Sequence, residues 1–182
     1  SGSLRTRGWE LGISWNHRFG DVDVFASANI YDGKTKVTEY NNPNKLINQF
    51  YSGMEYGEIW GFETDRYFEE SDFKGKNADG SWIYADGVAD QTGLEQGTFV
   101  YGPGDIKFKD LDGNGVINGG DPTMKDEKGN LIPVGTVRNH GDLKKIGNST
   151  PRYEYSFRVG AAWKGIDVDL FFQGVGKKDV YY

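Results

Sequence analysis

The stretch that decides the fold is residues 152–174, RYEYSFRVGAAWKGIDVDLFFQG. Apolar side chains occupy every second position on both sides of the tight turn at Lys164-Gly165. Because successive side chains of a strand point to opposite faces, this alternation gives each segment one apolar face and one polar face. Two such segments joined by two residues predict an antiparallel hairpin. The apolar set is Tyr153, Tyr155, Phe157, Val159, Ala161, Trp163, Ile166, Val168, Leu170 and Phe172.

A second pair of alternating segments lies near the N-terminus. GWELGISWN (8–16) and DVDVFASANIY (21–31) are joined by the short connection HRFGD (17–21), and we expect them to form another hairpin. The apolar face begins with Trp9, Leu11, Ile13 and Trp15. The opposite faces of the four strands carry Glu10, Asp23, Glu154, Arg158, Asp167 and Asp169.

Two-faced strands of this kind fit two environments. One is a soluble sheet with a dry side and a wet side, and the other is a membrane barrel with lipid outside and a watery lumen. Predicted strands of about 9–12 residues exceed the usual globular length of about 5–6. Trp and Tyr near the strand ends also resemble the aromatic girdles of membrane barrels. The alternation alone leaves both environments open.

The composition supports an all-β class and removes several kinds of chemistry. Glycine (27 of 182 residues) and aromatic residues (15%) are both abundant. The absence of cysteine excludes disulfides, thiolate catalysis and Cys-ligated zinc. His17 and His140 are too far apart in sequence to form a metal-binding spacing. With a net charge of −6 and no basic run longer than Lys144-Lys145 or Lys177-Lys178, the chain is not expected to bind nucleic acid.

Between the two hairpins lies a long segment, 39–150, rich in Gly, Asn, Asp, Lys and Glu. Only 55–68 and 104–111 look like short ordered elements, the first a strand followed by a helical turn. A connection of this length is abnormal in a compact domain. It is normal on the outer side of a bacterial membrane barrel, where loops are long and the turns at the other end are short.

Within that segment, DLDGNGVINGGD (110–121) has the spacing of a calcium loop. Oxygen-bearing side chains occupy its first, third, fifth, ninth and twelfth positions, glycine the sixth, and a backbone carbonyl would serve at the seventh. Asp at the twelfth position is shorter than the usual Glu, which predicts weak affinity. The candidate ligands are Asp110, Asp112, Asn114, Val116 (through its carbonyl), Asn118 and Asp121.

The alternative is a Gly/Asn/Asp-rich turn that binds nothing, since turns are made of these residues. No paired hand or flanking amphipathic helix is visible, so a structural Ca²⁺ clip is favoured over a sensor. Ile117 would be the apolar anchor of the loop. Nothing in the sequence favours an enzyme, and acidic pairs such as Glu69-Glu70 are better explained as a solvated face than as the carboxylates of a glycoside hydrolase.

Four segments together resemble a known family: LRTRGWELGISW, GEIWGFETDRYF, PGDIKFKDLDGNGVI and IGNSTPRYEYSFRVGAAWKGIDVDLFFQGVGKKD. In this order they are similar to the SusC/RagA-type TonB-dependent outer-membrane transporters of Bacteroidetes. The resemblance implies a 22-stranded barrel with a plugged lumen. It also implies nutrient uptake energised by TonB through a plug domain, and a SusD-like surface lipoprotein that captures glycan oligomers or peptides for polysaccharide utilization or peptide uptake.

On this resemblance the chain is expected to be an internal piece from the C-terminal half of such a barrel, without the plug region. Residues 1–38 and 151–182 would be barrel hairpins in outer-membrane lipid. Residues 39–150 would form one extracellular loop, and the turns at 17–21 and 163–167 would be periplasmic. The rival hypothesis is a secreted soluble β-module that binds carbohydrate and uses the calcium loop as a clip.

Overall fold

The computed structural model of the chain describes residues 1–180 and is built from antiparallel strands, which confirms the all-β class. None of the helical segments in this described part is long and apolar enough to cross a membrane. The two short 3₁₀ turns are Glu70–Asp72 and Thr92–Leu94. The strands are β1 (Ser3–Phe19), β2 (Val22–Glu39), β3 (Glu58–Phe62), β4 (Thr64–Tyr67), β5 (Phe73–Lys76), β6 (Trp82–Tyr84), β7 (Ile106–Phe108), β8 (Leu143–Asn148), β9 (Arg152–Trp163) and β10 (Ile166–Lys177).

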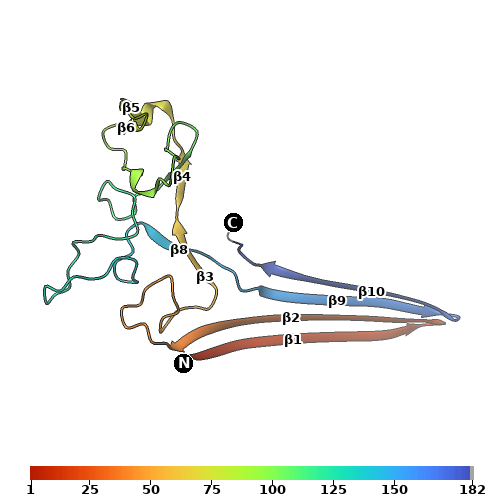
Figure 1. The fold of residues 1–182 in the computed structure, drawn as a ribbon. Helices are drawn as coiled ribbons and strands as arrows, with labels where there is room; N and C mark the ends of the chain where they lie inside the picture. The colour runs from red at the N-terminus through yellow and green to blue at the C-terminus, as the bar shows by residue number, and fades with distance from the viewer. Residues whose placement is uncertain (181–182) are drawn as a thin grey trace. The chain divides into compact units, whose positions relative to one another are not determined.

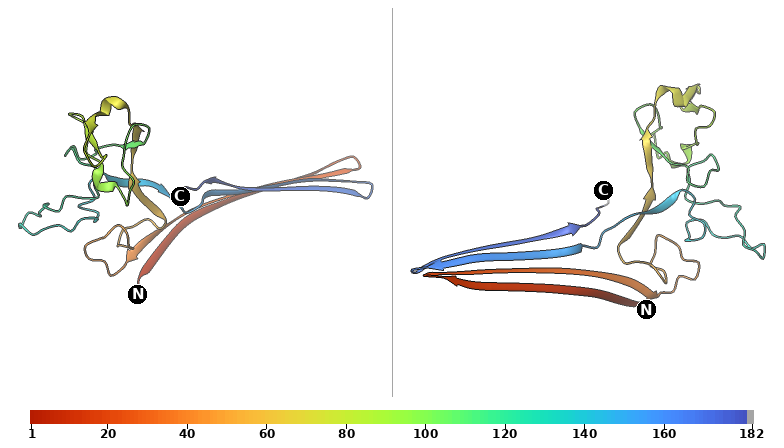
Figure 2. Two further views of the ribbon diagram at one scale, coloured as in Figure 1. Left: turned by 45° about the horizontal axis from the view of Figure 1, so that its top comes forward. Right: turned by 180° about the vertical axis from the view of Figure 1, so that it is seen from behind.

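Both predicted hairpins are present, and they join in one four-stranded sheet of order β1-β2-β9-β10 (Figure 1). β2 pairs antiparallel with β9 although more than a hundred residues separate them. The C-terminal hairpin was predicted over 151–182, of which 181 and 182 lie outside the described residues. Figure 2 shows from two further sides that the four strands run side by side.

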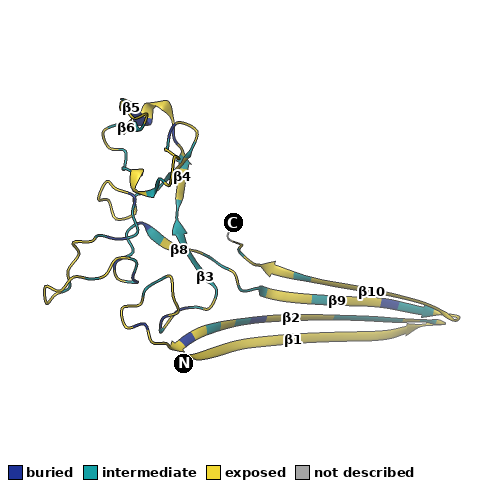
Figure 3. Ribbon diagram, viewed as in Figure 1, coloured by how far each residue is buried: buried dark blue, intermediate teal, exposed yellow. Residues whose placement is uncertain are grey.

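The register places the apolar side chains of all four strands on one face. Ile13 lies opposite Ala28, Ala28 opposite Phe157, and Phe157 opposite Phe172, so that one row crosses the whole sheet. Rings of Phe157 and Phe172 stack with centroids 4.6 Å apart. This face remains open to solvent in the chain: Ile13 is 63% exposed and Leu170 50%. Figure 3 shows the same for β1, which is exposed along its full length.

The two hairpin turns lie at the same end of the sheet, because Val22 pairs with Trp163. Gly20 has a φ of +61°, which glycine adopts without strain. Lys164 and Gly165 both have positive φ, at +47° and +84°, as a two-residue type I′ turn requires. The long connection between β2 and β9 therefore leaves from the other end.

β1 and β2 extend beyond the segments that alternation predicted. β1 has 17 residues and β2 has 18, because pairing continues through Arg7↔Lys34 and Arg5↔Lys36 to the start of β1. On the face that carries Trp9, these extensions have Arg and Lys instead of apolar residues, so the alternating pattern that marks a two-faced strand is missing there.

The chain divides into two compact units, of which the first is the four-stranded sheet with residues 52–59. Segment 52–59 is bonded to β2: the Val37 N–H donates to the Met54 carbonyl at 2.9 Å, and the Tyr56 N–H to the Thr35 carbonyl at 2.8 Å. Val37 and Met54 are buried beside this contact. The first unit thus has a small closed patch at its loop end and an open apolar face elsewhere.

The second unit comprises residues 41–51 and 60–146 and is built from short two-stranded ladders, β4-β7 and β5-β6, while β3 pairs with β8. The expected helical turn within 55–68 is wrong: that stretch holds two strands, β3 and β4, and the 3₁₀ turn follows at 70–72. Aromatic side chains form the core here. Phe68 is 2% exposed and packs on Phe73 and Tyr84, and Phe73 packs on Trp82.

The second unit also contains ion pairs with short hydrogen bonds. Arg66 donates two hydrogen bonds to Asp72, at 2.6 and 2.7 Å, and Asp72 is buried. The Arg66 guanidinium lowers the pKa of Asp72 to about 2, against the opposing effect of burial. Glu63 accepts hydrogen bonds from Lys109 and Lys144, which likewise lower its pKa to about 2.

Candidate functional site

The 110–121 loop turns tightly through hydrogen bonds from its own backbone. Asp110 accepts from the N–H groups of Gly113 and Gly115 at 2.7 and 2.8 Å. Positive φ values of +74° and +83° at these two glycines allow the chain to curl around the Asp110 carboxylate. Ile117 is 1% exposed, so it is buried as an apolar anchor of the loop would be.

The remaining predicted ligands lie along this turn. The Asp112 carboxylate accepts from the N–H of Asn114 at 3.1 Å, and the side-chain Oδ1 of Asn114 accepts from the N–H of Val116 at 2.7 Å. The Asn118 amide donates to the Val116 carbonyl at 3.3 Å. The Asp121 carboxylate accepts instead from the N–H and hydroxyl of Thr123, both at 2.7 Å, which lowers the pKa of Asp121.

A carboxylate that the sequence analysis did not name completes the group. Asp110, Asp112 and Asp142 each offer an oxygen, and these oxygens lie within 4.8 Å of one another. Asp142 is 0% exposed and receives the N–H of Leu111 at 2.6 Å and that of Asn118 at 2.9 Å. Asp142 therefore holds both arms of the turn. The group of three carboxylates is Asp110, Asp112 and Asp142, and it does not include Asp121.

Three carboxylates so close together repel one another. Burial raises the pKa of Asp112, and the neighbouring charges of Asp142 and Asp110 raise it further. Carboxylate and carbonyl oxygens in this number are hard ligands that suit Ca²⁺. The residues that could hold such an ion are Asp110, Asp112 and Asp142, together with the polar atoms of Asn114, Val116 and Asn118.

The spacing of a calcium loop could not have identified Asp142, because a long stretch of turns separates it from residues 110–121 in the sequence. The only local signal is its position directly before β8, which returns the chain beside β3. Its contact with the loop arises from long-range folding, where the Asp142 N–H also donates to the Asn118 carbonyl at 2.9 Å.

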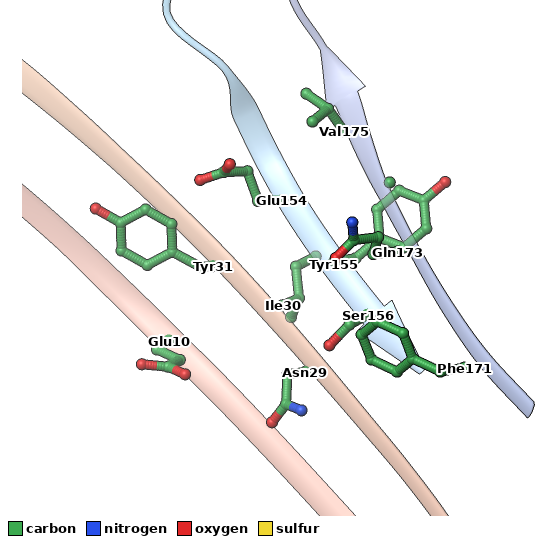
Figure 4. Close-up of a pocket in the computed structure, with 11 residues that line it drawn as sticks. Glu10, Asn29, Ile30, Tyr31, Glu154, Tyr155, Ser156, Phe171, Gln173 and Val175 are labelled. Atoms are coloured by element: carbon green, nitrogen blue, oxygen red, sulfur yellow. The ribbon is translucent and has the colours of Figure 1, made fainter. Parts of the chain in front are cut away.

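The polar face of the sheet carries a shallow groove across all four strands (Figure 4). Its volume is about 640 Å³. Carboxylates, amides and hydroxyls from neighbouring strands surround it, and Phe171 adds an aromatic ring. The lining residues with polar side chains on this face are Glu10, Asn29, Tyr31, Glu154, Ser156 and Gln173.

An ion pair and an aromatic ring cover the same polar face nearer the hairpin turns. Arg158 bonds to Asp169 across β9 and β10, with Nε 2.8 Å from one carboxylate oxygen. The Arg158 guanidinium lies 5.3 Å from the centre of the Phe25 ring. Phe25 lies directly over Gly160, where a Cβ atom would come within 2.4 Å of the ring. This face therefore offers charge and hydrogen bonding along its length, opposite the apolar one.

The chain is similar to a solved structure of a peptide importer. The "Structure of the RagAB peptide importer in the 'closed-closed' state" matches with 18% sequence identity and a TM-score of 0.48, over 96% of this chain and 15% of that one. The chain thus spans 15% of the length of the importer chain that it matches. No family model matches the sequence, and no curated protein does.

Proposed function

We propose that this chain is a segment of an outer-membrane, TonB-dependent transporter of the SusC type, whose four-stranded sheet lies in the barrel wall. The observation that carries the proposal is the open apolar face of the sheet. Leu11, Trp15 and Val168 are each at least half exposed there, on strands whose other face is polar. A contiguous apolar face of this size is rare on a soluble monomer, whereas lipid covers it at no cost.

The height of the apolar face fits a bilayer. Along β1 the face runs from Trp9 to Phe19, which is ten residue steps or about 33 Å at about 3.3 Å per residue. Strands of membrane barrels tilt by about 40°, so this length rises about 25 Å along the membrane normal. That is the height of the apolar band of outer-membrane barrels.

The edges of the sheet support the same proposal. β1 and β10 are the outer strands, and long edge strands expose N–H and C=O groups that pair readily with other strands. In a closed barrel each edge meets a neighbouring strand, so that every backbone group in the lipid is bonded. The parent protein would supply those neighbours.

Orientation follows from the lengths of the connections. The two short turns would face the periplasm, and residues 39–150 would lie outside the cell. There they would meet a SusD-like lipoprotein that delivers glycan oligomers or peptides. The polar groove would line the path or contact the plug through which TonB acts. The family resemblance given in Sequence analysis supports these partners.

Cysteine scanning of the full-length parent protein tests the proposal. The chain contains no cysteine, so single Cys residues at Ile13 and Leu170, and at the adjacent polar-face residues Ser14 and Asp169, are unique within it. In intact outer membranes we expect the cysteines at 13 and 170 to react poorly with a charged maleimide. Fluorescent labels attached at these positions should be quenched by lipid-soluble reagents. Labels at 14 and 169 should show lipid-soluble quenching that is several-fold weaker.

Equal water access at both members of each pair would reject the barrel and favour the rival, a secreted carbohydrate-binding β-module. Burial of positions 13 and 170 inside a water-soluble core would have the same meaning. The matched pairs share a strand and a height, so differences between them report the face alone.

We also propose that the 110–121 loop binds Ca²⁺ as a structural clip. The observation in favour is the approach of Asp110, Asp112 and Asp142 to within 4.8 Å. A divalent cation would offset their repulsion and order the long loop. Extracellular modules of this kind bind at roughly 10⁻⁴–10⁻³ M, where Ca²⁺ outside a cell is plentiful enough.

Calorimetry of the parent with millimolar Ca²⁺ tests the clip. Asp112→Ala should reduce affinity at least about tenfold and speed amide exchange over 104–135, because it removes one of three charged ligands. Asp126→Ala is the matched control, since Asp126 forms a turn of the same kind outside the group. Comparison of Asp142→Asn with Asp121→Asn shows which carboxylate closes the site. The clip would be rejected if 5 mM Ca²⁺ gave neither binding heat nor a change in amide exchange. That concentration is about five times the largest expected dissociation constant, roughly 10⁻³ M.

A further inference from the structure

The apolar face of the sheet ends in a basic cluster at the end away from the hairpin turns. Beyond Trp9 and Asp32, the same face continues through Arg7 opposite Lys34 and then Arg5 opposite Lys36. These side chains surround a depression of about 550 Å³. We call this surface the basic rim; it is lined by Arg5, Arg7, Trp9, Asp32, Gly33, Lys34, Lys36, Thr38 and Arg152.

Most of the positive charge of the basic rim is not neutralised. Asp32 is buried and bonded to Arg152, with the two outer atoms 2.6 Å apart, and Lys34 lies 3.7 Å from Glu55. Among residues 1–180, no carboxylate lies within ion-pair distance of Arg5, Arg7 or Lys36, all of which are exposed. Five cationic side chains therefore face two carboxylates, which leaves a surplus of three positive charges.

We propose that the basic rim binds the phosphate groups of a phosphorylated glycolipid in the outer leaflet of the membrane. This inference rests on the proposed function, which places the adjoining apolar face in lipid. The occupant must be both apolar and anionic, since Trp9, 50% exposed, borders the cluster on one side and the basic rows Arg7–Lys34 and Arg5–Lys36 lie on the other. A free polyanion would leave the apolar half uncovered.

The heights agree with a lipid headgroup. Arg7 and Arg5 lie two and four residues beyond Trp9, about 7 and 13 Å along the strand. With a tilt of about 40° these become about 5 and 10 Å above the apolar boundary. The headgroup layer of a bilayer is about 5–7 Å thick on each side, so the first basic row lies within it and the second about 3 Å beyond it.

The chemistry of the side chains also fits phosphate. A guanidinium binds phosphate oxygens through two parallel N–H donors, and Trp at the interface places its ring among the upper acyl carbons. Arg152 is fixed by Asp32 and forms the floor beside the exposed arginines. Because the runs of basic residues along the sequence are short, only the pairing of β1 with β2 creates the cluster.

The test uses the full-length parent in neutral detergent, titrated with diphosphorylated lipid A, with phosphatidylcholine and with inorganic phosphate. A dye on Cys at position 38, one of the lining positions, reports binding at the rim. The triple variant Arg5→Gln, Arg7→Gln, Lys36→Gln should bind lipid A at least about tenfold more weakly, since each basic residue near an anionic surface contributes about fivefold. Raising the salt concentration should weaken wild-type binding in the same direction.

The matched control is Lys125→Gln, Lys128→Gln, Arg138→Gln, which removes three exposed charges from the other unit and should change the affinity less than twofold. Equal lipid A affinity in both triple variants would overturn the inference, as would equal binding of phosphatidylcholine or displacement of lipid A by equimolar phosphate. If the cysteine pairs on the two faces show membrane insertion while these results fail, only the basic rim is rejected. If insertion itself fails, both proposals fall.

Discussion

The sheet and the second unit use their large apolar side chains in opposite ways. In the sheet, Ile13 and Leu170 are 63% and 50% exposed and point away from any core. In the second unit, Phe68 and Ile117 are 2% and 1% exposed and lie at the centre of short ladders and turns. The alternation of strands decides the first arrangement, whereas long-range contacts among irregular segments decide the second. Apolar side chains of the same types therefore act differently in the two regions. In the second unit they pack against one another, whereas in the sheet they need a covering that the chain itself does not supply.

The largest expected effect is that of a charge placed on the apolar face of the sheet. Ile13→Arg should destabilise the parent by about 2–4 kcal/mol in lipid vesicles, because position 13 is near the middle of the apolar face. Ser14→Arg, one residue away on the polar face, is the control and should cost less than about 0.5 kcal/mol. Urea unfolding of the vesicle-bound protein measures both. Equal stability of the two variants in vesicles would contradict a lipid-covered face at position 13.

The next effect concerns the second unit, where a single buried carboxylate holds two arms of a turn. Asp142→Ala leaves the N–H groups of Leu111 and Asn118 without their acceptors, at a cost of about 2–3 kcal/mol. Amide exchange at 111 and 118 should accelerate accordingly, measured in chelator so that metal plays no part. Asp126→Ala should affect only its own exposed turn, and unchanged exchange at 111 and 118 in the Asp142 variant would contradict the assignment.

Acid should weaken the second unit through Asp72. Its pKa is about 2 in the folded chain because Arg66 donates two hydrogen bonds to it, compared with an ordinary value of 3.8. A lowered pKa stabilises the fold above about pH 4, and this contribution is lost as the pH falls toward 2. Near-ultraviolet circular dichroism of the aromatic core should report the loss.

Arg66→Gln should flatten that pH dependence and lower stability at neutral pH by about 1–2 kcal/mol. The cost is moderate because the arginine side chain is 39% exposed, where solvent screens the pair. Lys74→Gln is the control, since its partner Asp86 is 96% exposed. A steep acid transition that survives in Arg66→Gln would assign the sensitivity to other carboxylates.

The sequence predicts more of the sheet than of the second unit. The two hairpins, their apolar faces and the all-β class follow from alternation, which depends only on neighbouring residues. The pairing of β2 with β9 does not, because nothing local specifies a partner so distant in the chain. The basic ends of β1 and β2 do not follow from alternation either, since Arg and Lys replace apolar residues on the face that carries Trp9.

In the candidate metal loop, the spacing of Asp110, Asp112 and Asn114 is a local property and can be identified from the sequence. Asp142 is not, because only the folded chain brings it beside the loop. β5, β6 and β8 escaped prediction for a related reason: they are short, and their pairing depends on the aromatic core around Phe68 and on ion pairs rather than on periodicity.

The smallest expected effect tests whether that aromatic core extends to its rim. The Lys76 ammonium lies 4.2 Å from the centre of the Trp82 ring, on the strand paired with it. Lys76→Gln should destabilise the β5-β6 ladder by about 0.5–1 kcal/mol, the range of exposed cation–π contacts, with a matching change in tryptophan fluorescence. Lys76→Arg keeps the charge over the ring and should restore the stability of the native chain. If glutamine and arginine behave alike, the aliphatic stem of the side chain rather than its charge covers Trp82. The second unit would then have apolar contacts at its surface as well as in its core. In that respect it would resemble the sheet more than the comparison above suggests.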